Sequence, residues 1–229
     1  MKKVRSWWLP DWDTSFQRDM EHKDIDGHQI IQRKFILEKI KTFESWKPML
    51  AIDIGANVGF WSRDFCKHFD QVLAYEPMSY NLECLEKNVT DKNFTIKRHA
   101  LGIGSETKKI FYTLNNNCGS PSFHEHTLRN DKDILTTTVK VTKFDDELLE
   151  YSEEHKSNCY MKLDVQGHEK DVITGARDFI QKYRPIITIE IRESRKRHKW
   201  NDIFQKYRYK LLFNYKKEYT FICRHRFSK

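Results

Sequence analysis

The sequence contains little glycine and little proline: 8 glycines and 5 prolines in 229 residues, against 14% aromatic residues. This composition excludes a linker-rich or disordered chain, and the length predicts a single folded domain with a large core. No apolar run approaches the roughly 18 residues of a membrane span. The residues from Met1 to Trp8 also lack the apolar stretch of a signal peptide, so we expect no membrane association.

Cysteine is also scarce and unpaired in pattern. The five cysteines are scattered, odd in number and free of any C-x-x-C spacing. This argues against a disulfide framework and against a zinc site. We therefore expect a reducing, cytoplasmic environment and predict no metal site.

The positive charge is unevenly placed. Of the net charge of +8, the residues from Arg192 onward contribute 13 Lys or Arg against only 3 Asp or Glu. The cluster consists of Arg192, Arg195, Lys196, Arg197 and Lys199. Such a cluster can bind an anionic partner such as nucleic acid, but it is more often a solvated face.

The most informative stretch runs from Met49 to Gly59. The apolar run Met49 to Ile54 predicts a buried strand, and Val58 to Phe69 repeats its apolar residues at helical spacing. Between them lies a turn with Gly55, Asn57 and Gly59. A strand, a glycine turn and a helix begin a βαβ unit, whose turn offers backbone N–H groups to a ligand.

The charge of this turn indicates which ligand it binds. A dinucleotide site has the pattern G-x-G-x-x-G, whereas this chain has Asp53-x-Gly55-x-x-x-Gly59. A carboxylate repels a pyrophosphate and suits the sulfonium and ammonium groups of S-adenosylmethionine (SAM). We therefore expect Asp53 at the mouth of a SAM site, and Asp53 argues against an NAD-linked enzyme.

Two later segments extend the same site. Gln71 to Tyr75 predicts a second strand that ends at Glu76-Pro77, where a carboxylate can accept both ribose hydroxyls. Phe94 to Lys97 predicts a third strand, and Ala100 and Leu101 follow it near the expected adenine pocket. A plain turn at Ala100 and Leu101 is the alternative interpretation.

The remaining elements alternate in type. We predict helices at 29–43, 79–88, 142–148, 172–180 and 200–207, strands at 159–163 and 185–191, and hairpins pairing 109–114 with 136–141 and 209–214 with 219–223. The pattern predicts an α/β protein whose sheet is parallel except at one edge. Residues 1–47 form an N-terminal extension with an aromatic cluster around Trp7 and Trp8, and 48–229 form the main domain. The segment 115–133 is expected to be a substrate-side loop.

These blocks, together with Lys162 to Glu169 (KLDVQGHE), resemble the FkbM family of SAM-dependent methyltransferases. The resemblance spans roughly 51–192. It implies a class I, Rossmann-like sheet of seven strands, SAM as the methyl donor, and methylation of a hydroxyl group on a sugar or small molecule. The family usually has Glu where this chain has Gln166, so a metal-binding or base role at that position is in doubt.

The expected carboxyl edge of the sheet supplies the catalytic candidates Asp164, His168 and Glu190. Methyl transfer to a hydroxyl group needs a base, and histidine is the best proton acceptor near neutral pH. Each residue has a plainer interpretation: Asp164 as a helix cap, His168 as an exposed helix start, and Glu190 as an ion-pair partner of Arg192 or Lys162.

The sequence therefore predicts a SAM-dependent O-methyltransferase that acts on a small-molecule or glycan hydroxyl group. Two alternatives remain open. One is a nucleic-acid methyltransferase that uses the basic C-terminal region, although no Asp/Asn-Pro-Pro-Tyr stretch supports it. The other is a SAM-binding module without catalytic activity.

Overall fold

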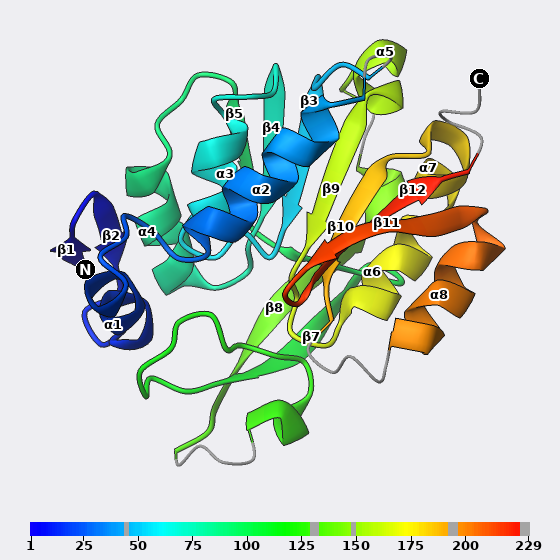
Figure 1. Cartoon of the computed structure of the whole chain (residues 1–229). Coiled ribbons are helices and arrows are strands. Elements are labelled where there is room, and N and C mark those ends of the chain that lie inside the picture. Colours follow the sequence, from blue (N-terminus) through cyan, green and yellow to red (C-terminus); the bar gives the residue numbers. More distant parts are fainter. Residues whose placement is uncertain (44–45, 129–132, 148–149, 192–196, 225–229) are drawn as a thin grey trace.

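A seven-stranded sheet with helices on both faces forms the centre of the computed structural model (Figure 1). The structure describes residues 1–43, 46–128, 133–147, 150–191 and 197–224. The strand order is β11-β12-β10-β9-β3-β4-β5. In chain order the strands are β3 (Leu50–Ile54), β4 (Gln71–Tyr75), β5 (Phe94–Lys97), β9 (Cys159–Leu163), β10 (Ile186–Glu190), β11 (Tyr209–Tyr215) and β12 (Glu218–Cys223).

The sheet is parallel except for β12, which pairs antiparallel with both β10 and β11. The predicted α/β class, the mostly parallel sheet and the C-terminal hairpin are confirmed. After β3, the chain adds β4 and β5 on one side and later adds β9 and β10 on the other. The carboxyl ends of β3 and β9 therefore flank the switch point of the sheet, which is where open α/β sheets bind ligands.

Helices cover both faces, which explains why the central strands are continuous apolar runs. On one face lie α2 (Ile30–Lys41), α3 (Phe60–Phe65) and α4 (Ser79–Asn88). On the other lie α6 (Glu169–Gly175), α7 (Arg177–Tyr183) and α8 (Arg197–Lys206). Every residue of β3 and of β9 is buried, including the charged residues Asp53 and Lys162, which are paired in register.

A second sheet of three strands lies beside the carboxyl end of the main sheet. It has the order β6 (Ala100–Gly102), β8 (Leu135–Lys143) and β7 (Glu106–Tyr112), and it contains the predicted hairpin. The helix predicted for 142–148 is wrong at its start, because Thr142 and Lys143 continue β8 before the short 3-10 helix η2 (Phe144–Asp146). The segment between β7 and β8 contains the 3-10 helix η1 (Glu125–Leu128), and α5 (Glu153–Ser157) precedes β9.

Two other helices differ from their predicted extent. The helix predicted for 58–69 is shorter, since Gly59 caps it with φ +98°. The helix predicted for 172–180 belongs to two helices, α6 and α7, which are interrupted at Ala176. Apolar periodicity continues across this break, so the sequence alone does not reveal it.

The N-terminal extension is packed against the main domain. It contains the strands β1 (Lys2–Val4) and β2 (Trp7–Leu9) and the helix α1 (Ser15–His22) before α2. Trp7 is buried with its ring centroid 4.6 Å from that of Phe60, so it serves as a core residue. The backbone of Trp8 exchanges two hydrogen bonds with the side chain of Asn88. None of the described helices is both long and apolar enough to cross a membrane.

Candidate active site

The turn after β3 is shaped by a close approach of two strands. Gly55 has φ +84°, and a Cβ atom added there would lie 2.1 Å from the carbonyl oxygen of Asp164. Only glycine fits this position. A Cβ atom at Gly59 would instead contact Leu85 of α4 and Val89, the residue that follows α4. Gly59 therefore allows close helix packing, and it lines neither of the two cavities described below.

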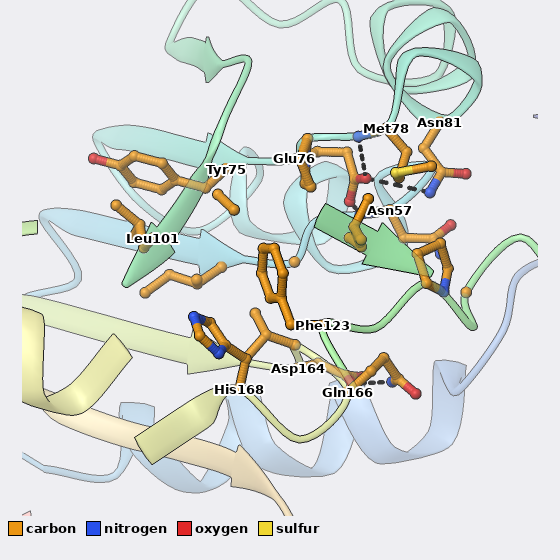
Figure 2. A pocket seen from close by; sticks show the side chains of 18 of the residues that line it. Asn57, Tyr75, Glu76, Met78, Asn81, Leu101, Phe123, Asp164, Gln166 and His168 are labelled. Carbon is orange, nitrogen blue, oxygen red and sulfur yellow. Dashed lines mark hydrogen bonds between the residues drawn. The ribbon is translucent and has the colours of Figure 1, made fainter. Parts of the chain in front are cut away.

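A cavity with an empty volume of about 550 Å³ lies over the carboxyl ends of β3, β4 and β9 (Figure 2). The predicted residues Gly55, Asn57, Glu76, Pro77, Ala100, Leu101 and Asp164 all line it. In Figure 2, Leu101 and His168 lie on one side of this cavity and Glu76 and Asn81 on the other. The predicted substrate-side loop contributes Cys118 and Phe123.

Glu76 is held from several sides. One carboxylate oxygen accepts the N–H of Asn57 at 2.9 Å, and the other accepts the N–H of Met78 at 3.0 Å and the side-chain amide of Asn81 at 3.3 Å. Burial raises its pKa to about 7, although these donors oppose the shift. The carboxylate is thus fixed in orientation at the end of β4.

A second cavity, with an empty volume of about 700 Å³, adjoins the first. The two share Gly55, Asn57, Gly119, Asp164 and Gln166. Its other lining residues include Glu190 and Trp61 of the main domain and Phe16, His28 and Gln29 of the N-terminal extension. The sequence patterns predict the helix that begins near Gln29, but they do not indicate that Phe16 and His28 line a cavity.

The linings of both cavities are acidic. They include the carboxylates of Glu76, Asp164 and Glu190 but, among the described residues, neither lysine nor arginine. No group of three His, Cys, Asp or Glu side chains within the described ranges could hold a metal ion.

Asp53 does not lie at the mouth of the site, contrary to expectation. Its side chain is buried, accepts a hydrogen bond from Ser62 Oγ at 2.6 Å, and is absent from both linings. Burial raises its pKa to about 6, against the opposing effects of Ser62 and Lys162. The carboxylates that line the first cavity, and that would repel a pyrophosphate there, are those of Glu76 and Asp164.

A buried lysine lies behind the acidic walls. Lys162 is fully buried, with its ammonium group 3.1 Å from Glu218 and 3.7 Å from Asp164. Burial opposes its charge, yet the neighbouring carboxylates raise the pKa of Lys162. Sequence reasoning missed Glu218, although an acidic residue at the start of an otherwise apolar strand is a usable signal.

The three catalytic candidates are not brought together. Asp164 lines both cavities, Glu190 only the second, and His168 only the first. His168 is buried against Phe123, with ring centroids 4.5 Å apart, and its Nδ1 lies 3.2 Å from Asp171. Burial lowers the pKa of His168 to about 4, which makes it a weak base. The alternative of an exposed helix start is right about the helix start, since His168 precedes α6 directly, but wrong about the exposure.

Asp164 accepts a hydrogen bond from Gln166 Nε2 at 2.7 Å. The N-cap position of α6 is occupied by His168, whose side chain makes no capping hydrogen bond. The helix-cap interpretation of Asp164 is therefore wrong. A glutamate in place of Gln166 would oppose Asp164 with like charge. Arg192, the suggested partner of Glu190, lies outside the described residues, as do Arg195 and Lys196 of the basic cluster. Arg197 and Lys199 are exposed on α8 and line neither cavity.

The fold and this site define a class I methyltransferase. More specifically, the chain belongs to the methyltransferase FkbM domain family, whose model matches residues 53–221. A similar solved structure is methyltransferase FkbM from Methylobacillus flagellatus KT, with 15% identity, a TM-score of 0.50, and coverage of 77% of this chain. The chain spans only 43% of that protein's length.

Two other solved structures are similar at the level of fold. The ribosomal protein L11 methylase from Lactobacillus delbrueckii subsp. bulgaricus has 10% identity, a TM-score of 0.49, and coverage of 88% of this chain and 81% of its own. The precorrin-6y C5,15-methyltransferase from Geobacter metallireducens GS-15 has 10% identity, a TM-score of 0.49, and coverage of 94% and 91%. No curated protein sequence matches the chain.

Proposed function

We propose that this methyltransferase uses SAM and transfers the methyl group to a hydroxyl group of a sugar or another small molecule. Several groups in the first cavity fit the adenosine part of SAM. Glu76 can accept the ribose hydroxyls, and Leu101 and Phe123 offer apolar surface to the adenine. The buried Oδ1 of Asn81 has no hydrogen-bond partner among the described residues, so it is left to accept a ligand donor.

The single observation that carries this proposal is the acidic character of the two linings. A dinucleotide would place its pyrophosphate among Glu76, Asp164 and Glu190 without a lysine or arginine from the described lining. The same carboxylates attract the sulfonium and ammonium groups of SAM. The charge of the site therefore favours SAM over NAD or NADP.

The second cavity fits the acceptor. SAM, when bound, supplies an activated methyl group, and the protein must orient a nucleophile and accept its proton. Asp164 and Glu190 can accept hydrogen bonds from acceptor hydroxyl groups, and Gln29 and Asn117 add polar surface. An uncharged polyhydroxyl compound suits this lining, whereas the phosphates of a nucleic acid would be repelled by it.

Isothermal titration calorimetry with SAM tests the cofactor assignment. Glu76→Ala removes a buried carboxylate that we assign to the ribose, so the affinity for SAM should fall about 10- to 100-fold, since a hydrogen bond to a charged group contributes about 1.5–3 kcal/mol. The exposed Glu83 on α4, the next helix along the chain, provides the matched control Glu83→Ala, which should leave the affinity unchanged. Equal affinities of wild type and Glu76→Ala would remove Glu76 from this role.

A further inference from the structure

The second cavity is partly built by residues outside the family domain. The family model begins at residue 53, whereas Ser15, Phe16, His28 and Gln29 belong to the N-terminal extension. Gln29 is fixed by the indole N–H of Trp61, which donates to its side-chain oxygen at 3.0 Å. If the second cavity holds the acceptor, these residues of the extension lie beside the acceptor.

His28 is the residue of this group with proton-transfer chemistry. Its Nδ1 lies 2.7 Å from Asp19 Oδ2, and its ring packs against Phe16 and Phe60 with centroids 4.8 and 5.9 Å away. The side chain keeps 31% of its surface exposed and lines the cavity. When Nδ1–H donates to a carboxylate, the neutral imidazole carries its lone pair on Nε2.

We propose that His28 is the general base for the acceptor hydroxyl group and that Asp19 is its positioning residue; this rests on the SAM-dependent function proposed above. The alternatives in the same cavity are the carboxylates of Asp164 and Glu190. His28 is the candidate among these groups because Asp19 orients its imidazole, and its partly exposed ring can take up a proton at Nε2 and release it to solvent.

Atoms and charge are conserved in the proposed methyl transfer. The acceptor oxygen gives its proton to Nε2 of His28 and forms a bond to the methyl carbon. The bond between that carbon and sulfur breaks, and its electron pair stays on sulfur as a neutral thioether. His28 becomes an imidazolium ion beside the Asp19 carboxylate and later releases its proton to solvent.

Charged groups of both signs lie around His28, and Asp19 is the carboxylate in direct contact with its imidazole. Asp19 of α1 forms an ion pair with Lys23, the residue that follows this helix, next to the imidazole. Asp164 and Glu190 line the same cavity from the ends of β9 and β10. On α2, Arg33 lies over the Phe60 ring, at 5.8 Å, and pairs with Asp64. The carboxylates stabilise the imidazolium ion that the step forms.

The test is a ¹⁵N NMR titration of the full chain in the presence of SAM, S-adenosylhomocysteine or NAD, with His28 assigned from the signals lost in His28→Gln. We expect the Nδ1–H tautomer. We also expect the pKa of His28 to be roughly one pH unit lower with SAM than with S-adenosylhomocysteine, because only SAM brings a positive sulfonium near Nε2. His22, exposed on α1, is the internal control and should titrate identically with both.

The outcomes separate the two proposals. If neither SAM nor S-adenosylhomocysteine shifts any signal, the SAM-dependent function and the assignment of His28 both fall. If both shift other signals while His28 titrates identically with the two ligands, or has the Nε2–H tautomer, only the assignment of His28 is overturned.

Variants of Asp19 give a second readout. Asp19→Asn should increase the Nε2–H tautomer of His28, and Asp19→Glu should restore the Nδ1–H form. Asp24→Asn, in which an exposed carboxylate paired with Arg5 is lost, should change neither. With any hydroxyl acceptor that the wild-type protein methylates, His28→Gln should lower kcat about 100-fold at unchanged SAM affinity. An unchanged tautomer in Asp19→Asn or an unchanged kcat in His28→Gln would contradict the proposal.

Discussion

Individual buried charges determine the electrostatics of the site. Lys162 is buried beside Glu218 and Asp164, and a buried charge is tolerated only with such partners. Lys162 offsets the negative charge of these carboxylates from within the core. It lines neither cavity, so the described lining side chains include carboxylates but no lysine or arginine. Within the described part of the chain, Glu76 forms no ion pair and accepts hydrogen bonds from three N–H donors.

Because Glu76 is buried without a neighbouring cation among the described residues, we expect its protonation to make the stability of the protein depend on pH. The folded-state pKa of Glu76, about 7, lies above its ordinary value of 4.5. The contribution of Glu76 to stability is therefore complete below about pH 4.5 and is lost as the pH rises through 7. Between pH 5 and pH 8, the free energy of unfolding of wild type should fall by about 2 kcal/mol more than that of Glu76→Gln. Urea denaturation at both pH values measures this, and equal falls would contradict it.

At the scale of secondary structure, local patterns and long-range contacts differ in what the sequence reveals. The strands around Asp53, Tyr75 and Leu163 were predictable because apolar runs bounded by turn residues are a local signal. The role of the N-terminal extension was not, since Asp13 accepts the N–H of Cys118 across 105 residues of chain. The same holds for His28, whose place in the cavity depends on how α1 packs.

The attachment of the extension to the loop is testable at Asp13. Its buried carboxylate accepts the N–H groups of Phe16 at 2.9 Å and Cys118 at 2.8 Å. Asp13→Ala leaves both donors without this acceptor, so the free energy of unfolding should fall by about 2 kcal/mol or more. The amide of Cys118 should also exchange faster with deuterium. Asp11→Ala removes an exposed carboxylate paired with the N-terminus and should change both quantities little; equal effects of the two variants would contradict this attachment.

At the scale of the whole molecule, the sheet topology places the two cavities at its switch point, and the family domain from 53 to 221 supplies most of the first. The fold and many of the residues that line the first cavity could be predicted, because they follow consecutive strands. Asp53 and Gly59 line neither cavity, because Asp53 accepts a hydrogen bond from Ser62 in the core and Gly59 lies close against Leu85 and Val89. Such tertiary contacts are not visible in a local sequence pattern. The second cavity, which we assign to the acceptor, is lined by residues from both the extension and the domain, and no single motif contains them all.

The central claim, that the acidic cavities bind SAM, is tested most directly by parallel thermal melting with SAM, S-adenosylhomocysteine, NAD and NADP. A ligand at 100 times its Kd adds about 2.7 kcal/mol to stability. For a chain of this length, that corresponds to a rise of roughly 5–10 °C in Tm. We predict this rise with SAM and S-adenosylhomocysteine and no rise with either dinucleotide. A rise with NAD or NADP, together with an unchanged Tm in SAM and S-adenosylhomocysteine, would contradict the account.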